Sequence, residues 1–343
     1  MNRLRFRGNR RIGDGEPPYI VAELNSSHNG KVEAAKQMIE TAKDCGCDCV
    51  KFQSWTTDSL YADEYYKNNP ISKRIVTKFS LTSAQLLELS DYCKKIGIDF
   101  ASTPYSIEEV DFLVGKTEAP FIKIASMEIN NLAYLEYIGK KGIPIVLSTG
   151  MSTIDEIRKA VRVIEATGNK QLCILHCVSV YPAQPEMINL NNMVMLQEEF
   201  PDYAIGYSDH TVGYDIAAAS IALGAVLVEK HFTLDNKKMG MDNNMATEPG
   251  EMKRLVNACQ SVFRAMGLKE RILLEGEKEQ RLKMRRSLVT AREIHRGVVL
   301  TAEDIEVKRP GDGITPDHLG DVIGKMVNTD IPKGYRIKPE YLY

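Results

Sequence analysis

Two apolar segments of the chain end abruptly in histidine. The segment "YAIGYSDHT" reaches Ser208 and His210, and "VLVEKHFTLD" reaches Glu229 and His231. Residues two apart on a strand point to the same face, so each pair shares a face. Histidines on neighbouring strands lie close enough to share one divalent cation, and a two-histidine site leaves positions for water and substrate, as catalytic sites do. The alternative is a hydrogen-bonded histidine pair without metal.

Two lysines mark other strand-like segments: Lys51, with Gln53 two residues later, in "DCVKFQ", and Lys123 in "PFIKIAS". A buried lysine with a lowered pKa can form a Schiff base with a carbonyl substrate. Alternatively, two charged lysines can clamp a phosphate or a carboxylate. Short hydroxyl side chains end the same kind of segment at Thr103, Ser126, Ser148, Thr149, Ser179 and Ser208. Hydroxyl donors beside two cations favour a phosphorylated carboxylic acid as the ligand.

Eight strand-like segments carry these residues, and amphipathic helical stretches separate them. The segments are 19–24, 48–53, 98–103, 120–126, 143–149, 172–177, 203–209 and 225–232. Eight strand–helix pairs in about 250 residues predict an α/β fold, a (β/α)8 TIM barrel whose chemistry lies at the carboxyl ends of the strands. A doubly wound open sheet would need a glycine-rich phosphate turn after its first strand, and "AELNSSHNG" has none.

Changes in composition predict three parts of the chain. Residues 1–268 form an N-terminal hairpin and the barrel, 269–286 form a charged linker or solvated helix, and 287–343 form a small β-rich domain. That last part contains two similar pieces, "AREIHRGVVLTAEDI" and "NTDIPKGYRIKPEYL". The start, "RLRFRGNRRIG", alternates apolar residues with arginines around a turn-forming Gly-Asn, which favours a hairpin over a nucleic-acid-binding arm.

The overall composition excludes several classes of protein. A net charge of −2 over 343 residues does not indicate a nucleic-acid or anionic-membrane partner. No apolar run approaches the ~20 residues of a membrane span, and no signal peptide is visible. The seven cysteines have no even disulfide spacing, and we expect structural thiols, including those of the C-x-C-x-C run, in a reducing cytoplasmic compartment.

Nine motifs in fixed order carry a resemblance to a known family. They are "AELNSSHNG", "VKFQS", "STPYS", "KIASMEINN", "STGMST", "LHCVSVYPA", "GYSDHT", "ALGAVLVEKHFTLD" and "VKRPGDGI". From about residue 10 to its end the chain resembles the sialic acid (nonulosonic acid) synthases, which condense phosphoenolpyruvate with an N-acylated hexose. The resemblance implies a TIM barrel, a C-terminal domain like type III antifreeze proteins (SAF domain), and a domain-swapped homodimer.

The resemblance also assigns roles to individual residues. His210 and His231 match ligands of Mn²⁺ or Mg²⁺, and Glu23 and Glu128 match acids that face the substrates. The residues matched to phosphoenolpyruvate are Lys51, Lys123, Thr103, Ser126, Ser148 and Ser208. The remaining residues of the expected substrate-binding set are Gln53, Ser179, Tyr181, Asp242 and Arg309, of which Tyr181 and Asp242 line the sugar side. Arg309 is implied to cross the dimer to the acyl group of the sugar.

Departures from the family pattern concern the sugar pocket. Met127 stands where glycine is common, Asn243 where histidine is usual, and Ser179 where many relatives have asparagine. The acceptor is therefore expected to be N-acetylmannosamine or a diacetamido-trideoxyhexose, with the motifs "KFQS", "GYSDHT" and "EKHFTLD" favouring the legionaminate type. The alternatives are a pyruvate aldolase with a Schiff base on Lys51 or Lys123, a tail with a separate carbohydrate-binding function, and a non-enzymatic barrel.

Overall fold

The computed structural model describes residues 3–13, 15–238 and 240–343. The chain divides into two compact units, Met1–Gly267 and Leu268–Tyr343. Helix α13 (Glu275–Met284) belongs to the second unit and occupies part of the segment expected to be a linker or solvated helix.

Eight parallel strands form the centre of the first unit. They are β3 (Tyr19–Glu23), β4 (Cys49–Gln53), β5 (Asp99–Thr103), β6 (Ile122–Ile124), β7 (Ile145–Ser148), β8 (Leu172–Cys177), β9 (Ala204–Asp209) and β10 (Leu227–His231). They hydrogen bond in the order β5-β4-β3-β10-β9-β8-β7-β6. In the described part of the chain β5 and β6 pack together without a ladder, so the ring is nearly closed. The predicted TIM barrel is confirmed, and the open doubly wound sheet is wrong.

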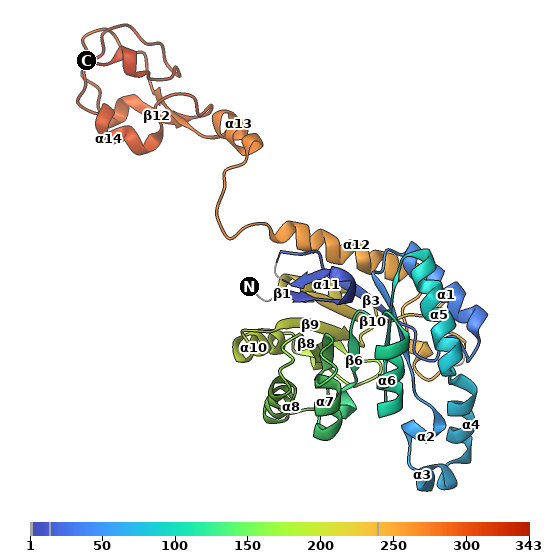
Figure 1. Cartoon of the computed structure of the whole chain (residues 1–343). Coiled ribbons are helices and arrows are strands. Elements are labelled where there is room, and N and C mark those ends of the chain that lie inside the picture. The colour runs from blue at the N-terminus through green and yellow to red at the C-terminus, as the bar shows by residue number, and fades with distance from the viewer. Residues whose placement is uncertain (1–2, 14, 239) are drawn as a thin grey trace. The chain divides into compact units, whose positions relative to one another are not determined.

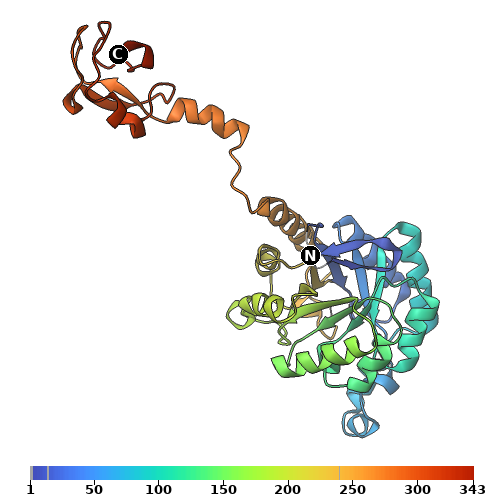
Figure 2. The same ribbon diagram turned by 60° about the vertical axis from the view of Figure 1, so that its left-hand side comes forward.

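Helices follow the strands and lie outside them (Figures 1 and 2). These are α1 (Val32–Asp44), α5 (Ser83–Ile96), α6 (Ile107–Lys116), α7 (Leu132–Gly139), α8 (Ile154–Ala166), α10 (Asn191–Glu199), α11 (Asp215–Ala222) and α12 (Pro249–Met266), with a short α9 (Pro185–Ile188) before α10. Helix α8 illustrates the sequence logic: Thr153 and Glu156 form a capping box, and buried Ile157, Val161 and Ile164 recur at helical spacing.

The connection after β4 is unusually long and forms a lobe. It contains α2 (Thr57–Leu60), α3 (Asp63–Asn68) and α4 (Pro70–Phe79), which project from the barrel in Figure 1. Trp55, Tyr66, Val76 and Phe79 are buried together and form a small core for this lobe. Because it follows the carboxyl end of β4, the lobe stands at the end of the barrel where chemistry is expected.

The N-terminal hairpin closes the opposite end of the barrel. Strands β1 (Arg3–Arg5) and β2 (Arg11–Gly13) pair antiparallel, and Gly8 and Asn9 have positive φ in the turn. Phe6 is 1% exposed, and its ring centroid lies 5.2 Å from that of Tyr19 and 4.7 Å from that of Phe121. Its cluster continues into the barrel interior with Tyr19, Val21, Cys49, Ala101, Phe121, Val146, Cys173, Leu175, Ala204 and Leu227. Burying one such ring stabilises the fold by about 1.5–3 kcal/mol.

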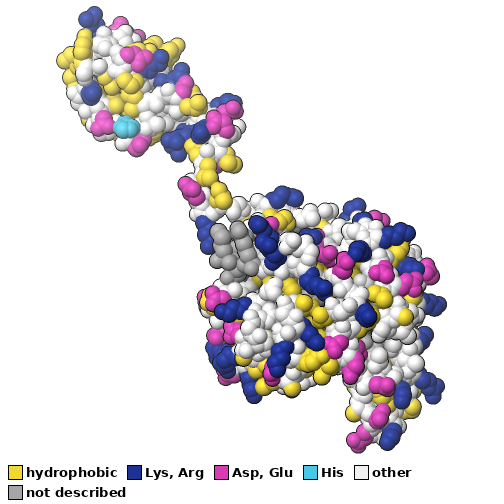
Figure 3. Space-filling view, viewed as in Figure 1, with side chains coloured by type: hydrophobic (Ala, Val, Ile, Leu, Met, Phe, Trp, Pro, Cys, Tyr) yellow, Lys and Arg dark blue, Asp and Glu magenta, His cyan; other side chains and the backbone are white. Residues whose placement is uncertain are grey.

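The surface carries both signs of charge. On the face drawn in Figure 3, Lys and Arg are interspersed with Asp and Glu, in accord with a net charge of −2. Among the described residues, no helix is both long enough and apolar enough to span a bilayer. All seven cysteines are buried, free thiols.

The second unit contains the two similar sequence pieces. Strand β11 (Ser287–Thr290) pairs antiparallel with β12 (Ile305–Lys308), and a short α14 (Leu319–Val322) follows. Ile294 of the first piece and Ile331 of the second exchange backbone hydrogen bonds of 2.9 and 2.8 Å. Both residues are buried in a core that includes Leu288, Leu300, Val322, Val327 and Ile337. The repeats therefore pair with each other, which gives a small unit its core.

Candidate active site

A cavity of about 320 Å³ lies at the carboxyl ends of the barrel strands. The expected site residues that line it are Glu23, Lys51, Gln53, Thr103, Lys123, Ser126, Ser148, Ser179, Tyr181, Ser208, His210, His231 and Asp242. Strand alternation explains the grouping. On β4, Cys49 faces the barrel core, so Lys51 and Gln53 point into the cavity above it.

Two expected residues do not line this cavity. Glu128 lies in a short 3₁₀ turn (Ser126–Glu128), where its carboxylate accepts a 2.9 Å hydrogen bond from the Asn131 side chain. Arg309 is exposed and belongs to the second unit. Their assignments stay predictions.

Ladder register places charged residues side by side across three strands. Glu23 pairs with Lys51 on β4 and with His231 on β10. The Glu23 carboxylate forms an ion pair with the Lys51 ammonium, both nearly inaccessible to solvent. Glu229 lies between the two lysines, with carboxylate oxygens 3.8 Å from the Nζ atoms of both Lys51 and Lys123. The cavity thus holds two buried ammonium groups. The carboxylates nearest to them do not use all of their hydrogen-bonding capacity within the described protein.

Burial and mutual charge shift the pKa values of this cluster. Burial lowers the pKa of Lys123. Burial also acts to lower the pKa of Lys51, but the carboxylates of Glu229 and Glu23 outweigh it and raise that pKa. Burial raises the pKa of Glu23, whereas Lys123 and Lys51 outweigh burial at Glu229 and lower its pKa. Glu23 is therefore the carboxyl group better suited to hold a proton, and Glu229 the one suited to stay ionised.

Hydroxyl groups surround the two ammonium groups. Lys51 Nζ donates to Thr103 Oγ1 at 3.1 Å, and Lys123 Nζ donates to Ser148 Oγ at 2.7 Å. The Gly150 N–H donates to Ser126 Oγ at 2.9 Å. A Cβ atom at Gly150 would lie 2.3 Å from Ser179 Oγ, so only glycine permits this close approach. The arrangement is a cradle of short donors around a cationic centre, suited to an anion.

The two histidines lie together, with ring centroids 5.4 Å apart. His210 Nδ1 is 2.7 Å from the Val178 carbonyl oxygen. Since a carbonyl only accepts, Nδ1 donates and Nε2 keeps a lone pair, which is the arrangement of a metal-ligating histidine. Burial lowers the pKa of His231 well below its usual value, so that ring is neutral. Burial also opposes the charged form of His210, but contacts with Cys177 and Val178 outweigh burial and raise the pKa of His210. A cation bound to His210 would therefore compete with the second proton of its ring.

These donors fit a divalent cation held by few protein ligands. Among the residues that the structure describes, no group of three or more His, Cys, Asp or Glu side chains could hold a metal. His210 and His231 would therefore supply the imidazole ligands, with water or substrate oxygens in the remaining positions. Asp209, the acid between Ser208 and His210, is not a ligand, because it points out of the barrel and pairs with Lys230 at 2.7 Å.

Tyr181 and Asp242 form the rim above the histidines. The Tyr181 ring centroid lies 4.2 Å from that of His210, and the Tyr181 side chain is 48% exposed. Asp242 accepts a hydrogen bond from the Asn25 side chain, which joins the loop after β10 to the loop after β3. Polar groups at this rim can bind a hydroxylated ligand while the strand ends hold an anion.

Two of the three departures from the family pattern, Asn243 and Met127, have different surroundings. Asn243 is buried, and its side-chain nitrogen donates to the Asp235 and Lys238 carbonyls at 2.7 Å each, so it holds the loop that carries Asp242. Met127 is 53% exposed and lines the cavity.

Sequence reasoning gave no role to several cavity residues. Glu229 was recognised as a polar strand end but not as the anion between the lysines. Cys177 was grouped with the structural thiols, yet its sulfur lies 3.9 Å from His210 Nδ1 in the cavity. Its position was detectable, because Cys173, Leu175 and Cys177 alternate towards the barrel interior. Asn25 lies in a loop, where no periodicity indicates direction.

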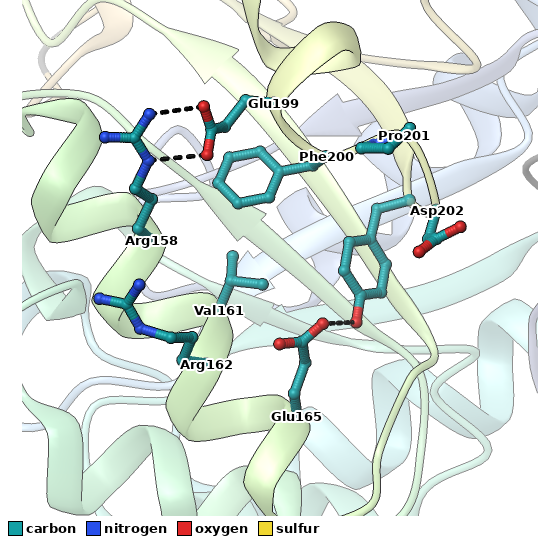
Figure 4. Close-up of a pocket in the computed structure, with 9 residues that line it drawn as sticks. Arg158, Val161, Arg162, Glu165, Glu199, Phe200, Pro201 and Asp202 are labelled. Atoms are coloured by element: carbon teal, nitrogen blue, oxygen red, sulfur yellow. Dashed lines mark hydrogen bonds and ion pairs between the residues drawn. The ribbon is translucent and has the colours of Figure 1, made fainter.

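A second hollow, on the outside of the barrel, lacks these features. It lies between α8 and the segment that leads into β9, and two of its carboxylates, Glu199 and Glu165, contact other residues of the hollow (Figure 4). Arg158 donates to both carboxylate oxygens of Glu199, at 2.7 and 2.6 Å. Glu165 accepts from the Tyr203 hydroxyl at 2.5 Å. These internal pairs favour a structural role for this hollow.

Comparisons with known proteins agree with this geometry. The NeuB family matches residues 38–271, and the SAF domain matches residues 285–340. The chain is 39% identical over 325 residues to an uncharacterised protein of Methanocaldococcus jannaschii, covering 94% of each chain. It is 33% identical over 339 residues to the N,N'-diacetyllegionaminic acid synthase of Legionella pneumophila, again covering 94% of each.

Solved structures are also similar over most of the chain. The N-acetylneuraminic acid synthetase of Leptospira borgpetersenii, in complex with citrate, superposes with a TM-score of 0.74 at 29% identity, covering 81% of this chain and 96% of that one. The second unit described above is thus a SAF domain following a TIM barrel.

Proposed function

The chain belongs to the NeuB family, and we propose that it is a synthase that condenses phosphoenolpyruvate with an N-acylated amino-hexose to give a nonulosonic acid and phosphate. One observation carries the proposal: two buried lysines, surrounded by hydroxyls, line a single cavity together with a pair of histidines. The named relatives, one a diacetyllegionaminic acid synthase and one a sialic acid synthetase, support it.

The residues divide the reaction between two ends of the cavity. Lys51, Lys123 and the serine and threonine hydroxyls hold the phosphate and carboxylate of phosphoenolpyruvate and fix its C3 towards the acceptor. His210 and His231 would hold a Mn²⁺ or Mg²⁺ ion, which when bound polarises the aldehyde oxygen of the open-chain sugar.

Carbon–carbon bond formation follows from this arrangement. C3 of the enol attacks C1 of the sugar, and positive charge develops at C2 beside the ionised Glu229. The aldehyde oxygen becomes a hydroxyl by taking a proton. Glu23 can donate this proton, because burial raises the pKa of its carboxyl group. Water then adds at C2, and phosphate leaves with cleavage of the C–O bond, so that the former phosphoenolpyruvate becomes the keto acid.

We extend the proposal to the acceptor and the assembly. A legionaminate-type diacetamido-trideoxyhexose is favoured over N-acetylmannosamine by the motifs and by the legionaminic acid synthase relative. A domain-swapped homodimer would let the partner's SAF domain present Arg309 to the acyl group, and the free thiols suit a cytoplasmic enzyme. Arg309→Ala should then raise KM for the hexose with little change in KM for phosphoenolpyruvate.

Phosphate release measures the proposed reaction directly. Purified protein is incubated with phosphoenolpyruvate, labelled with ¹⁸O at the bridging oxygen, and each candidate hexose. We expect hexose-dependent phosphate that retains the label, loss of activity on chelation, and recovery with Mn²⁺ or Mg²⁺. Activity that survives complete chelation would contradict the metal requirement, and phosphate without label would contradict C–O cleavage.

The Schiff-base aldolase is the second candidate, because burial lowers the pKa of Lys123. Borohydride added with pyruvate and an aminosugar would trap a covalent adduct on Lys51 or Lys123 if that mechanism operates. We expect no adduct, since Lys123 Nζ already donates to Ser148 Oγ and to the Ile124 carbonyl. A trapped lysine would replace the synthase proposal.

A further inference from the structure

An apolar hollow, different from the outer hollow of Figure 4, adjoins the cavity at its rim. It has a volume of about 290 Å³ and is lined by Tyr61, Ser72, Ile75, Val76, Phe79, Gly240 and Met241. Helix α4 of the projecting lobe forms one wall, and the loop after β10 forms the other. We call it the α4 groove.

The α4 groove differs in chemistry from the cavity beside it. Its floor is buried Val76 and Phe79, whereas Tyr61, Ile75 and Met241 are 40%, 37% and 41% exposed. Among the residues that the structure describes, none that lines the groove is charged. Large apolar side chains that are partly exposed at the edge of a polar cavity indicate a binding site, because a ligand that covers them removes apolar surface from water.

The groove and the cavity lie next to each other. Tyr61 and Met241 line both of them. The shared wall is braced, because the Met241 N–H donates to Ser26 Oγ at 2.9 Å and the neighbouring Asp242 accepts from Asn25. A ligand in the cavity would therefore have to pass Tyr61 and Met241 to reach the groove.

We propose that the α4 groove binds an N-acyl substituent at the end of the acceptor sugar remote from its reacting carbonyl. This inference rests on the proposed function. The lysines and histidines bring the carbonyl to the strand ends, so the other end of the sugar points to the rim. An acetamido group offers a methyl to Ile75 and Met241 and a polar amide to Ser72. A phosphate or free hydroxyl at that end of the sugar would lose hydration without gaining a charged partner.

The experiment compares three acceptors with the full-length protein. They are a 2,4-diacetamido-2,4,6-trideoxyhexose, N-acetylmannosamine and N-acetylmannosamine 6-phosphate, each assayed for kcat/KM by phosphate release. We expect the wild-type protein to prefer the diacetamido sugar. Ile75→Asp should reduce its preference over N-acetylmannosamine by about tenfold, equivalent to about 1.4 kcal/mol, while kcat/KM for N-acetylmannosamine changes little.

Two further variants keep the result interpretable. Ser72→Trp fills the groove without adding charge and should reduce the same preference. Ile71→Asp, at a 68% exposed position of the same helix outside the groove, should leave it unchanged. An unaltered preference in both Ile75→Asp and Ser72→Trp, or a wild-type preference for the phosphorylated sugar, would overturn the assignment of the groove as an N-acyl site. Neither result would contradict the proposed synthase function. Absence of phosphate release with every hexose would instead overturn the proposed function, and the groove assignment with it.

Discussion

The carboxyl ends of β9 and β10 carry two polar clusters, one on each face of the same strands. On the outer face Asp209 accepts from Lys230, the Tyr207 hydroxyl, and the backbone and hydroxyl of Thr211. On the inner face Glu229 accepts a 3.2 Å hydrogen bond from Ser208, but its other oxygen has no hydrogen-bond partner among the described residues. Alternation of side chains along a strand separates the two clusters.

The difference distinguishes a structural ion pair from a binding site. A buried charge is stable when each of its atoms is satisfied, as at Asp209. The inner cluster keeps charge and lone pairs that are only partly used, and a ligand can use them. Charged residues on one pair of strands thus serve either structure or binding. The two roles are distinguished by how completely the hydrogen-bonding capacity of each charged group is filled, not by residue type.

The largest expected effect on activity comes from removing an inner cation. Lys123→Met should lower kcat/KM by about 10²–10³, the usual cost of losing one preorganised group of this kind. The free energy of unfolding should change little, because burial already disfavours the Lys123 charge and Glu229 retains Lys51. Steady-state kinetics and urea unfolding measure the two effects. A variant with full activity would contradict the anion-binding role.

The same substitution on the outer face should act on stability instead. Lys230→Met leaves Asp209 buried and unpaired, which costs about 3–5 kcal/mol. Urea unfolding monitored by circular dichroism tests this. The double variant Lys230→Met/Asp209→Leu, which removes both charges, should recover part of the loss. If Lys123→Met were the more destabilising of the two matched variants, the distinction between the faces would be wrong.

A buried histidine away from the cavity gives a smaller, pH-dependent effect. Burial lowers the pKa of His28 from 6.5 to about 4. The unfolded chain therefore gains a proton near pH 6.5 that the folded protein accepts only near pH 4, so stability falls as pH decreases through this window, by roughly 3 kcal/mol in all. His28→Gln should remove this contribution. Parallel curves for wild type and variant between pH 7 and 4 would show that His28 does not titrate this way.

The smallest effect is expected in the outer hollow of Figure 4. The Arg158–Glu199 pair is bidentate but more than a third exposed at the arginine, so solvent screens it. Arg158→Ala should leave the midpoint of thermal unfolding and the kinetics close to those of the wild type. A marked fall in kcat/KM would reveal a function for this hollow.

Sequence patterns predicted most of the fold and the side-chain directions within strands. The barrel followed from eight alternating apolar segments, and the inward direction of Lys51, Gln53 and His231 from a period of two. Loop positions were not predictable from such patterns. Asn25, Met241 and helix α4 meet at the rim only because three separate connections pack together, and no local periodicity encodes that packing.

Barrel closure joins distant parts of the chain. The Tyr19 N–H donates to the Val226 carbonyl at 3.0 Å, and β3 pairs with β10 along its length. During synthesis β3 therefore leaves the ribosome long before β10 exists, and its unpaired edge must avoid other strands meanwhile. Folding should be slow for this reason, since the closing contacts span about two hundred residues. A nascent chain released before Val226 would expose that edge permanently and would be a target for chaperones or aggregation.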